Sequence, residues 1–166
     1  MTWKTILSFI VGATLLTLLS GWLIVANLLP IQAAIDYSEA ERSFLKIWLQ
    51  VALVIGLLLP VIAFLVWIRH PNVRTVFGFY LLVLAVQIVS EQIFSHVFSS
   101  SILVIIGTIY TTFRVGQLWQ SQQFLKVNAQ SGNVRDRVSQ SLLWLLLLFW
   151  SANLIFLLVV GWLRIL

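Results

Sequence analysis

Long apolar runs separated by short polar segments dominate this sequence. A helix that crosses the hydrocarbon core of a bilayer needs about 20 mostly apolar residues, and five segments meet this requirement. Pro30 closes the first run, the polar turn 69–74 closes the second, and serines 99–101 separate the third from the fourth. The pattern predicts an all-α integral membrane protein, a bundle of five transmembrane helices over residues 3–29, 39–68, 75–96, 102–120 and 134–164.

Two local signals refine the second helix. Ser38 followed by Glu41 is a capping-box pattern, in which each side chain bonds to the other residue's backbone N–H, so we expect the helix to begin near Glu39. Pro60 has no backbone N–H, and together with Gly56 it predicts a kink in the later half of the helix.

Small residues recur every four positions along the first helix, at Ala13, Thr17 and Gly21. Such a stripe lets another helix approach closely. Internal packing is the favoured interpretation, and an oligomer interface is the alternative. Because the first apolar run exceeds the 7–15 residues of a secretory signal, we expect it to remain in the membrane as a helix.

The composition agrees with a membrane protein. Hydrophobic residues make up 61% of the 166 residues and charged residues only 9%, against about 25% charged in soluble domains. The mean hydropathy is +1.04. A chain of this length has room for a single transmembrane domain, 1–166. It holds no cysteine, which excludes disulfides, thiolate metal sites and a cysteine nucleophile.

Basic residues gather on one side of the predicted membrane. Positively charged loops stay in the cytoplasm, so the charge pattern predicts a cytoplasmic N-terminus and an extracytoplasmic C-terminus, most simply in a plasma or inner membrane. The predicted cytoplasmic side carries Lys4, Arg69, Arg74, Lys126, Arg135 and Arg137, and the opposite side carries Asp36, Glu39, Glu41, Arg42, Lys46 and Arg164. The net charge of +5 therefore indicates a lipid partner. We find no basic stripe with interleaved aromatic residues, so the sequence does not indicate a nucleic-acid partner.

Polar side chains inside the apolar runs are the best candidates for function, because intramembrane ionisable residues are rare and costly. Helix depth, at about 1.5 Å per residue, places several of them at similar heights in the outer half of the bundle. Two interpretations remain open: a polar pocket in which Glu91 contacts a proton, cation or ligand, and a polar clasp that joins helices through Gln50 or Thr108. The predicted cluster consists of Glu91, Gln87, Gln50, Thr108 and Asn153.

Arg114 and His96 are candidate contacts for substrate or lipid. The backbones of Arg114 and Glu91 differ by about 10 Å in predicted height, so we expect the guanidinium to reach the cytoplasmic headgroups instead. His96 lies at the outer rim, far from His70 in the inner turn, so the two histidines do not predict a metal site. No cofactor is expected.

No catalytic motif is present, and a single intramembrane carboxylate without a second catalytic group argues against an enzyme. We expect a non-catalytic membrane protein: an accessory or assembly subunit of a larger complex, or a binder of lipid or another small molecule. Its expected partners are the bilayer, other membrane subunits or a second copy of the chain, and a small ligand. The alternative is a small transporter or channel that uses Glu91 in a polar cluster open to the outer face.

Overall fold

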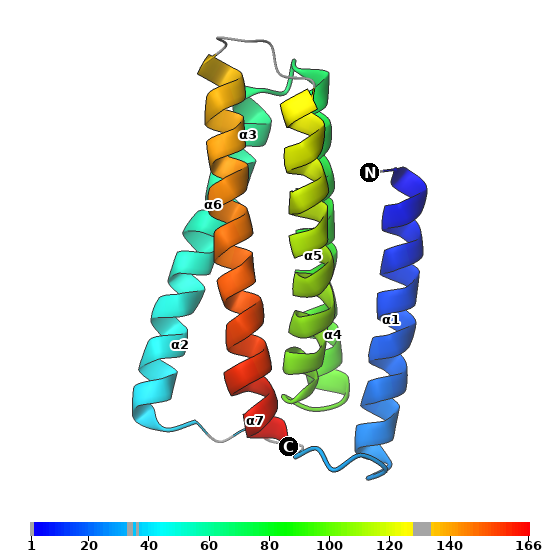
Figure 1. Ribbon diagram of the computed structural model, residues 1–166. Coiled ribbons are helices and arrows are strands. Elements are labelled where there is room, and N and C mark those ends of the chain that lie inside the picture. The colour runs from blue at the N-terminus through cyan, green and yellow to red at the C-terminus, as the bar shows by residue number, and fades with distance from the viewer. Residues whose placement is uncertain (1, 33–34, 36, 128–133) are drawn as a thin grey trace.

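The computed structural model describes residues 2–32, 35, 37–127 and 134–166, and these ranges form helices joined by short connections (Figure 1). Five of the helices are long and apolar enough to cross a membrane, which confirms the all-helical architecture and the five expected segments. Three of these segments are regular: α1 (Trp3–Val25), α4 (Pro71–Val97) and α5 (Ile102–Val127). The other two contain π-helical turns: α2 (Glu39–Val51) continues through η1 (Ala52–Leu58) into α3 (Leu59–Val66), and α6 (Val134–Phe156) continues through η2 (Leu157–Gly161) into α7 (Trp162–Ile165).

The first helix ends at Val25, four residues before the predicted end. Asn27 adopts a left-handed conformation with φ 53°, which suits the residue that follows a helix end. The N–H of Asn27 donates to the carbonyl of Ile24 and the N–H of Leu28 to that of Leu23, both at 3.0 Å. This pair of bonds is a Schellman motif, and it stops the helix although the sequence stays apolar.

The start of α4 also differs from the prediction. The helix begins at Pro71, not near Thr75. Proline is well suited to the first helical position, because its missing N–H would have no partner there and its fixed φ is already helical. Residues 71–74, predicted as part of a polar turn, therefore form the first turn of α4.

The capping box at the start of α2 is confirmed. The backbone N–H of Ser38 donates to the Glu41 carboxylate at 2.9 Å, and the backbone N–H of Glu41 donates to the Ser38 hydroxyl at 3.3 Å. Later in the same segment, the seven residues before Leu59 widen into the π-helical stretch η1. Pro60 cannot donate a hydrogen bond and its ring displaces the carbonyl four residues earlier, which accounts for a distortion at this point.

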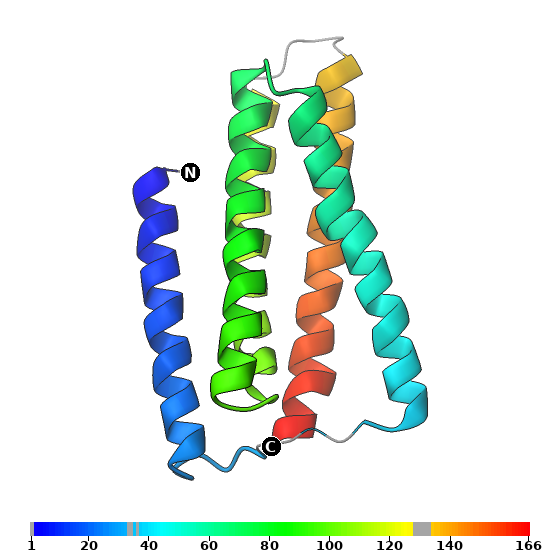
Figure 2. The same ribbon diagram turned by 180° about the vertical axis from the view of Figure 1, so that it is seen from behind.

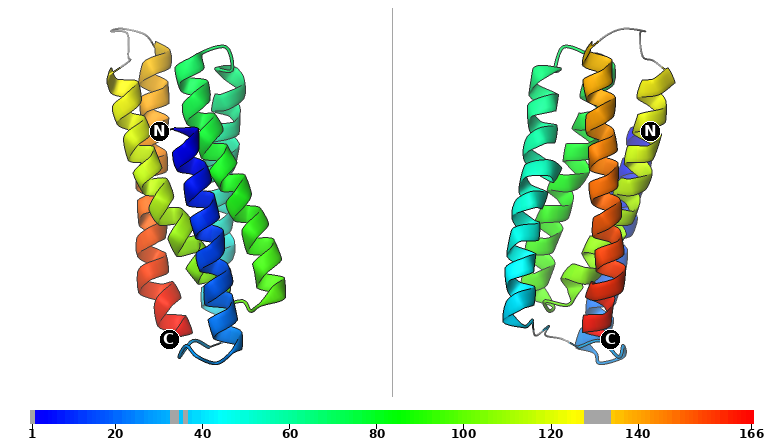
Figure 3. Two further views of the ribbon diagram at one scale, coloured as in Figure 1. Left: turned by 90° about the vertical axis from the view of Figure 1, so that its right-hand side faces the viewer. Right: turned by 60° about the vertical axis from the view of Figure 1, so that its left-hand side comes forward.

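The helices α4, α5 and α6 lie side by side at the centre, with α1 on the outer side of α4 and α5 (Figures 1 and 2). The segment α2–η1–α3 covers the other side, where α3 contacts α4 and η1 contacts α6. The N-terminal part of this segment, α2, leans outward from the bundle (Figure 2). We call the end with the α3–α4 turn and the start of α6 the amino end, and the end with the C-terminus and the α4–α5 turn the carboxyl end (Figure 3).

The small-residue stripe of α1 packs inside the chain, as the favoured interpretation predicted. Ala13, Thr17 and Gly21 are all buried, and α1 contacts both α4 and α5. A Cβ atom added to Gly21 would lie 2.4 Å from the ring of Phe98, so a larger residue here would force this ring to shift. The alternative, an oligomer interface on this face, is wrong.

Candidate functional site

A cavity of about 410 Å³ lies between α2, η1, α4, α5 and the α6–η2 segment, in the carboxyl half of the bundle. Aliphatic side chains form much of its wall, which is typical of sites for small molecules. Gly107 and Gly161, which have no side chain, also line it. Its polar and aromatic lining includes Tyr37, Trp48, Gln87, Glu91, Trp150 and Asn153.

Glu91 and Arg114 are joined through the amide of Gln87. The Gln87 Nε2 donates to Glu91 Oε1 at 2.6 Å, and the Arg114 Nη2 donates to Gln87 Oε1 at 2.6 Å. Gln87 lies one helical turn from Glu91 toward the amino end. Its amide therefore bridges the difference in height that the sequence predicted between Glu91 and Arg114. The structure therefore connects the two charged groups through one neutral side chain instead of a direct ion pair.

The side chain of Arg114 is completely buried, with 0% of its surface exposed. Its guanidinium carbon lies 4.1 Å from the centre of the Trp150 ring and 5.5 Å from that of Tyr80. Cation–π contacts of this kind favour a desolvated guanidinium. Its Nε and Nη1 atoms have no hydrogen-bond partner among the described residues.

The prediction that Arg114 reaches lipid headgroups is wrong for a geometric reason. Side chains on a helix lean toward the helix N-terminus. The N-terminus of α5 is at the carboxyl end of the bundle, so the Arg114 side chain leans toward Gln87 and away from the amino end. Arg114 therefore does not contact lipid.

A second polar chain crosses the cavity wall at Asn153. The Trp48 Nε1 donates to Asn153 Oδ1 at 2.8 Å, and the Asn153 Nδ2 donates to the hydroxyl of Thr111 at 3.3 Å. These bonds join α2, α6 and α5. Thr111 lies one turn before Arg114 on α5, so both polar chains meet the same face of that helix.

A third chain, around Tyr80, was not anticipated from the sequence. The Tyr80 hydroxyl donates to the carbonyl of Gly56 at 2.6 Å and accepts from the Trp150 Nε1 at 2.8 Å. In a regular helix the Gly56 carbonyl would accept from the residue four positions later, which is Pro60 and has no N–H. A helical proline followed along the chain by a tyrosine in another apolar run was the signal that could have indicated this bond.

The other predicted cluster members lie apart from Glu91. Gln50 is exposed on α2 and does not line the cavity, so its assignment to the polar cluster around Glu91 is wrong. Thr108 donates to the Val104 carbonyl at 2.7 Å on its own helix and accepts from the Trp162 Nε1 at 3.1 Å. It links α5 to α7, and neither Gln50 nor Thr108 is the partner of Glu91. His96 is exposed near the end of α4, where lipid contact stays a prediction.

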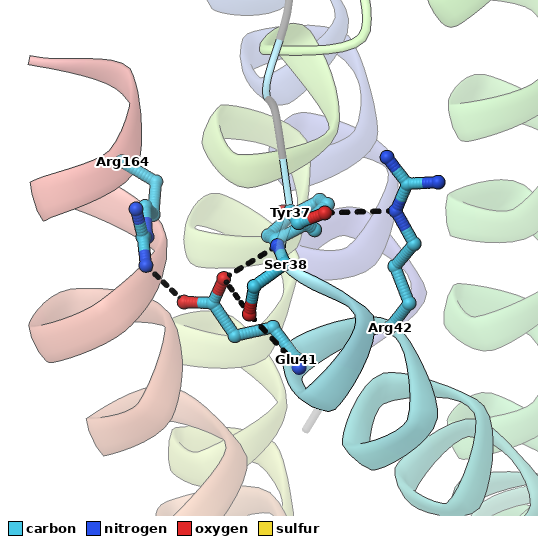
Figure 4. A network of polar contacts seen from close by, with 5 residues as sticks. All are labelled: Tyr37, Ser38, Glu41, Arg42 and Arg164. Carbon is cyan, nitrogen blue, oxygen red and sulfur yellow. Dashed lines mark hydrogen bonds and ion pairs between the residues drawn. The ribbon is translucent and has the colours of Figure 1, made fainter.

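Tyr37 stands in the connection just before α2, within a polar network at the carboxyl end (Figure 4). Its backbone carbonyl accepts from the Arg42 Nε at 2.8 Å. The Glu41 carboxylate that caps α2 also accepts from the guanidinium of Arg164 in α7. Burial raises the pKa of the Tyr37 hydroxyl above its ordinary value, and the nearby Glu41 carboxylate adds to this rise. Tyr37 is therefore a neutral group at the edge of the cavity.

Among the described residues, no cluster of three or more His, Cys, Asp or Glu side chains could hold a metal ion. Glu91, the carboxylate of the cavity, bonds to an amide. The arrangement offers a hydrogen-bonding carboxylate in an apolar, aromatic surrounding, which can recognise a polar group on an otherwise apolar molecule.

Residues 7–165 match a protein family described as a domain of unknown function, DUF7733, and the chain belongs to this family. No curated protein and no solved structure matches the chain.

Proposed function

We propose that this protein is a membrane-embedded binder of a small, largely apolar molecule, and that the cavity beside Glu91 is the binding site. The single observation that carries the proposal is the cavity itself, about 410 Å³ in volume, with a mostly apolar wall and a few fixed polar groups. Sites for small molecules share this combination. The cavity does not require a catalytic role, and we propose no enzymatic activity.

The surrounding structure supports a cavity that is built into the fold. Tyr80 provides a partner for the Gly56 carbonyl beside Pro60, next to the point where α2 leans outward. The polar side chains of the wall are held by bonds to other helices. A site whose polar groups are fixed before the ligand arrives loses less conformational entropy on binding.

The protein acts, in this proposal, within a plasma or inner membrane, with the amino end in the cytoplasm. Lys4, Arg69, Arg74, Lys126, Arg135 and Arg137 all belong to the amino end, as the positive-inside rule requires of a cytoplasmic side. The cavity then lies in the outer half of the bilayer.

This orientation is testable because the chain contains no cysteine. Single cysteines at exposed Ala40, near the carboxyl end, and exposed Asn72, near the amino end, report on the two faces. A membrane-impermeant maleimide added to intact cells should label Ala40→Cys and should label Asn72→Cys only after the cells are opened. Labelling of both positions in intact cells would contradict a membrane-spanning bundle, and the reverse pattern would contradict the orientation.

Binding is tested by photolabelling in proteoliposomes with dodecanol that carries a diazirine on its chain. Ala52 lines the cavity, so Ala52→Phe should fill part of it and lower the adducts on cavity residues such as Leu84 and Ile88 by about tenfold, equivalent to about 1.4 kcal/mol. Ala152→Phe is the matched control, because Ala152 is exposed on α6 and does not line the cavity. Equal adduct yields in both variants would refute the cavity as a binding site.

A small transporter remains the second candidate, favoured by the position of Glu91 in a cavity wall. On the amino side of Arg114, however, the bundle is filled by the buried side chains of Leu118, Leu143 and Leu146. A transporter would need another conformation to open that half. Solute or proton flux in proteoliposomes that is abolished by Glu91→Gln would favour transport, and absence of flux in the wild type would exclude it.

An accessory or assembly subunit stays a prediction from the sequence. Extensive apolar side chains on α1 and α2 are exposed in the single chain, as both lipid and a protein partner would require. Purification in mild detergent tests this role, which fails if the protein migrates as a single chain without bound subunits.

A further inference from the structure

The hydrogen bonds of the cavity wall define what kind of ligand the site can satisfy. Four side-chain nitrogens of the wall already donate to protein oxygens: Trp48 to Asn153, Asn153 to Thr111, Gln87 to Glu91, and Trp150 to Tyr80. The indole nitrogens have one hydrogen each, so both tryptophan donors are fully used. By contrast, a carboxylate has about four lone-pair sites, and only one bond, from Gln87, reaches the Glu91 carboxylate from the described residues.

The Glu91 carboxylate therefore keeps a large unused capacity to accept hydrogen bonds in the cavity wall. A ligand group that donates hydrogen bonds meets the free lone pairs of Glu91. A ligand carboxylate or phosphate would instead face the Glu91 carboxylate, and like charges in a site of low dielectric constant repel strongly.

The guanidinium of Arg114 stays outside the cavity, so it offers no hydrogen bond to a ligand there. One face of the guanidinium lies against the Trp150 ring, and its bond to the wall ends on the Gln87 oxygen. Arg114 does not line the cavity. Among the described residues that do line it, Glu91 is the one Asp, Glu, Lys, Arg or His side chain.

Aromatic side chains also line the cavity. Tyr37 in the connection before α2, Trp48 in α2, and Trp150 and Phe156 in α6 all line the cavity. Aromatic rings attract ammonium groups through their negatively charged faces, and sites for organic cations commonly combine several of them. The aliphatic residues of the wall offer a separate surface for an alkyl chain.

From these observations we infer that the cavity recognises an organic cation, an alkyl ammonium whose nitrogen bonds to Glu91 and whose chain lies along the aliphatic wall. This inference rests on the proposed function, since it assigns the chemical class of ligand to the same cavity. The Glu91 carboxylate is the acceptor that selects the charged ligand over a neutral ligand of equal chain length.

Two photoreactive probes of equal chain length test the inference: dodecylamine and dodecanol, each with a diazirine on the chain. An alkyl amine is protonated at neutral pH, since an ordinary amine such as that of lysine has a pKa near 10.4. In proteoliposomes of uncharged lipid, we expect the amine to label cavity residues at about tenfold lower concentration than the alcohol. Glu91→Gln should abolish this difference.

Glu39→Gln is the matched control, because Glu39 is an exposed carboxylate outside the cavity. If Glu39→Gln lowers the preference for the amine as strongly as Glu91→Gln does, the preference comes from surface charge and the inference fails. Equal labelling of the wild-type cavity by both probes also overturns the inference, while the cavity remains a binding site for apolar molecules. Labelling of the cavity by neither probe would overturn the proposed function as well, so the two failures are distinguishable.

Discussion

Replacing Tyr80 by phenylalanine probes the bond network that supports the outward-leaning second helix. The substitution removes only the hydroxyl, which donates to the Gly56 carbonyl and accepts from Trp150. A buried polar group that loses its partner costs roughly 1–3 kcal/mol in soluble proteins, whereas interhelical bonds within membranes average about 0.6 kcal/mol. For the two bonds together we expect a loss of about 1–3 kcal/mol in the free energy of unfolding.

Tyr110→Phe is the matched control for this measurement. Tyr110 is as deeply buried as Tyr80, with 1% of its surface exposed in each case. Its hydroxyl has no hydrogen-bond partner among the described residues. Unfolding in mixed micelles with increasing denaturing detergent should show little or no loss for Tyr110→Phe.

A double-mutant cycle with Pro60→Ala then tests why the Tyr80 bond exists. Alanine restores an N–H at position 60, which can donate to the Gly56 carbonyl within the helix. Tyr80→Phe should therefore cost about 1 kcal/mol less in the Pro60→Ala background than in the wild type. Equal losses for Tyr80→Phe and Tyr110→Phe, or additive effects of Pro60→Ala and Tyr80→Phe, would refute this reasoning.

Two further substitutions test packing and charge in the same unfolding assay. Gly21→Ala should destabilise the protein by about 1–3 kcal/mol, because the added methyl overlaps the Phe98 ring. Gly12→Ala should be neutral or stabilising, since nothing lies within 4 Å of the new atom; similar effects at both glycines would contradict the docking of α1. Gln87→Leu should cost about 3 kcal/mol because it leaves the buried guanidinium without its partner, and adding Arg114→Met should recover much of that loss. If exposed Gln92→Leu on the same helix is equally harmful, the effect is not due to the buried charge.

The number and place of the helices could be predicted from the sequence because the length of an apolar run is a strong and local signal. The same is true of the capping box at Ser38 and Glu41, whose two bonds form within one turn. The errors in helix bounds have local causes as well. A left-handed Asn27 ended α1 early, and the preference of proline for the first turn moved the start of α4.

The candidate site was predictable only in part, because depth along a helix does not specify direction around it. Glu91, Gln87 and Asn153 do line one cavity, whereas Gln50 at a similar predicted depth faces outward. The guanidinium of Arg114 reaches Gln87 because side chains on a helix lean toward the N-terminus of that helix. The direction in which α5 runs therefore decides whether Arg114 points toward Gln87 or toward the amino end. The bond from Tyr80 to Gly56 joins residues 24 positions apart, and the packing of α3 against α4 brings these segments together.

Competition at the cavity tests the central claim most directly. Wild-type protein in proteoliposomes is photolabelled with the diazirine-bearing dodecylamine while unlabelled dodecylamine is added in increasing amounts, and adducts on segment 84–91 are measured by mass spectrometry. A discrete cavity predicts that these adducts fall to a low plateau, while adducts on exposed apolar residues such as Leu15 and Leu163 decline only as the probe is diluted in the bilayer. A parallel decline at all of these positions would contradict the presence of a binding site.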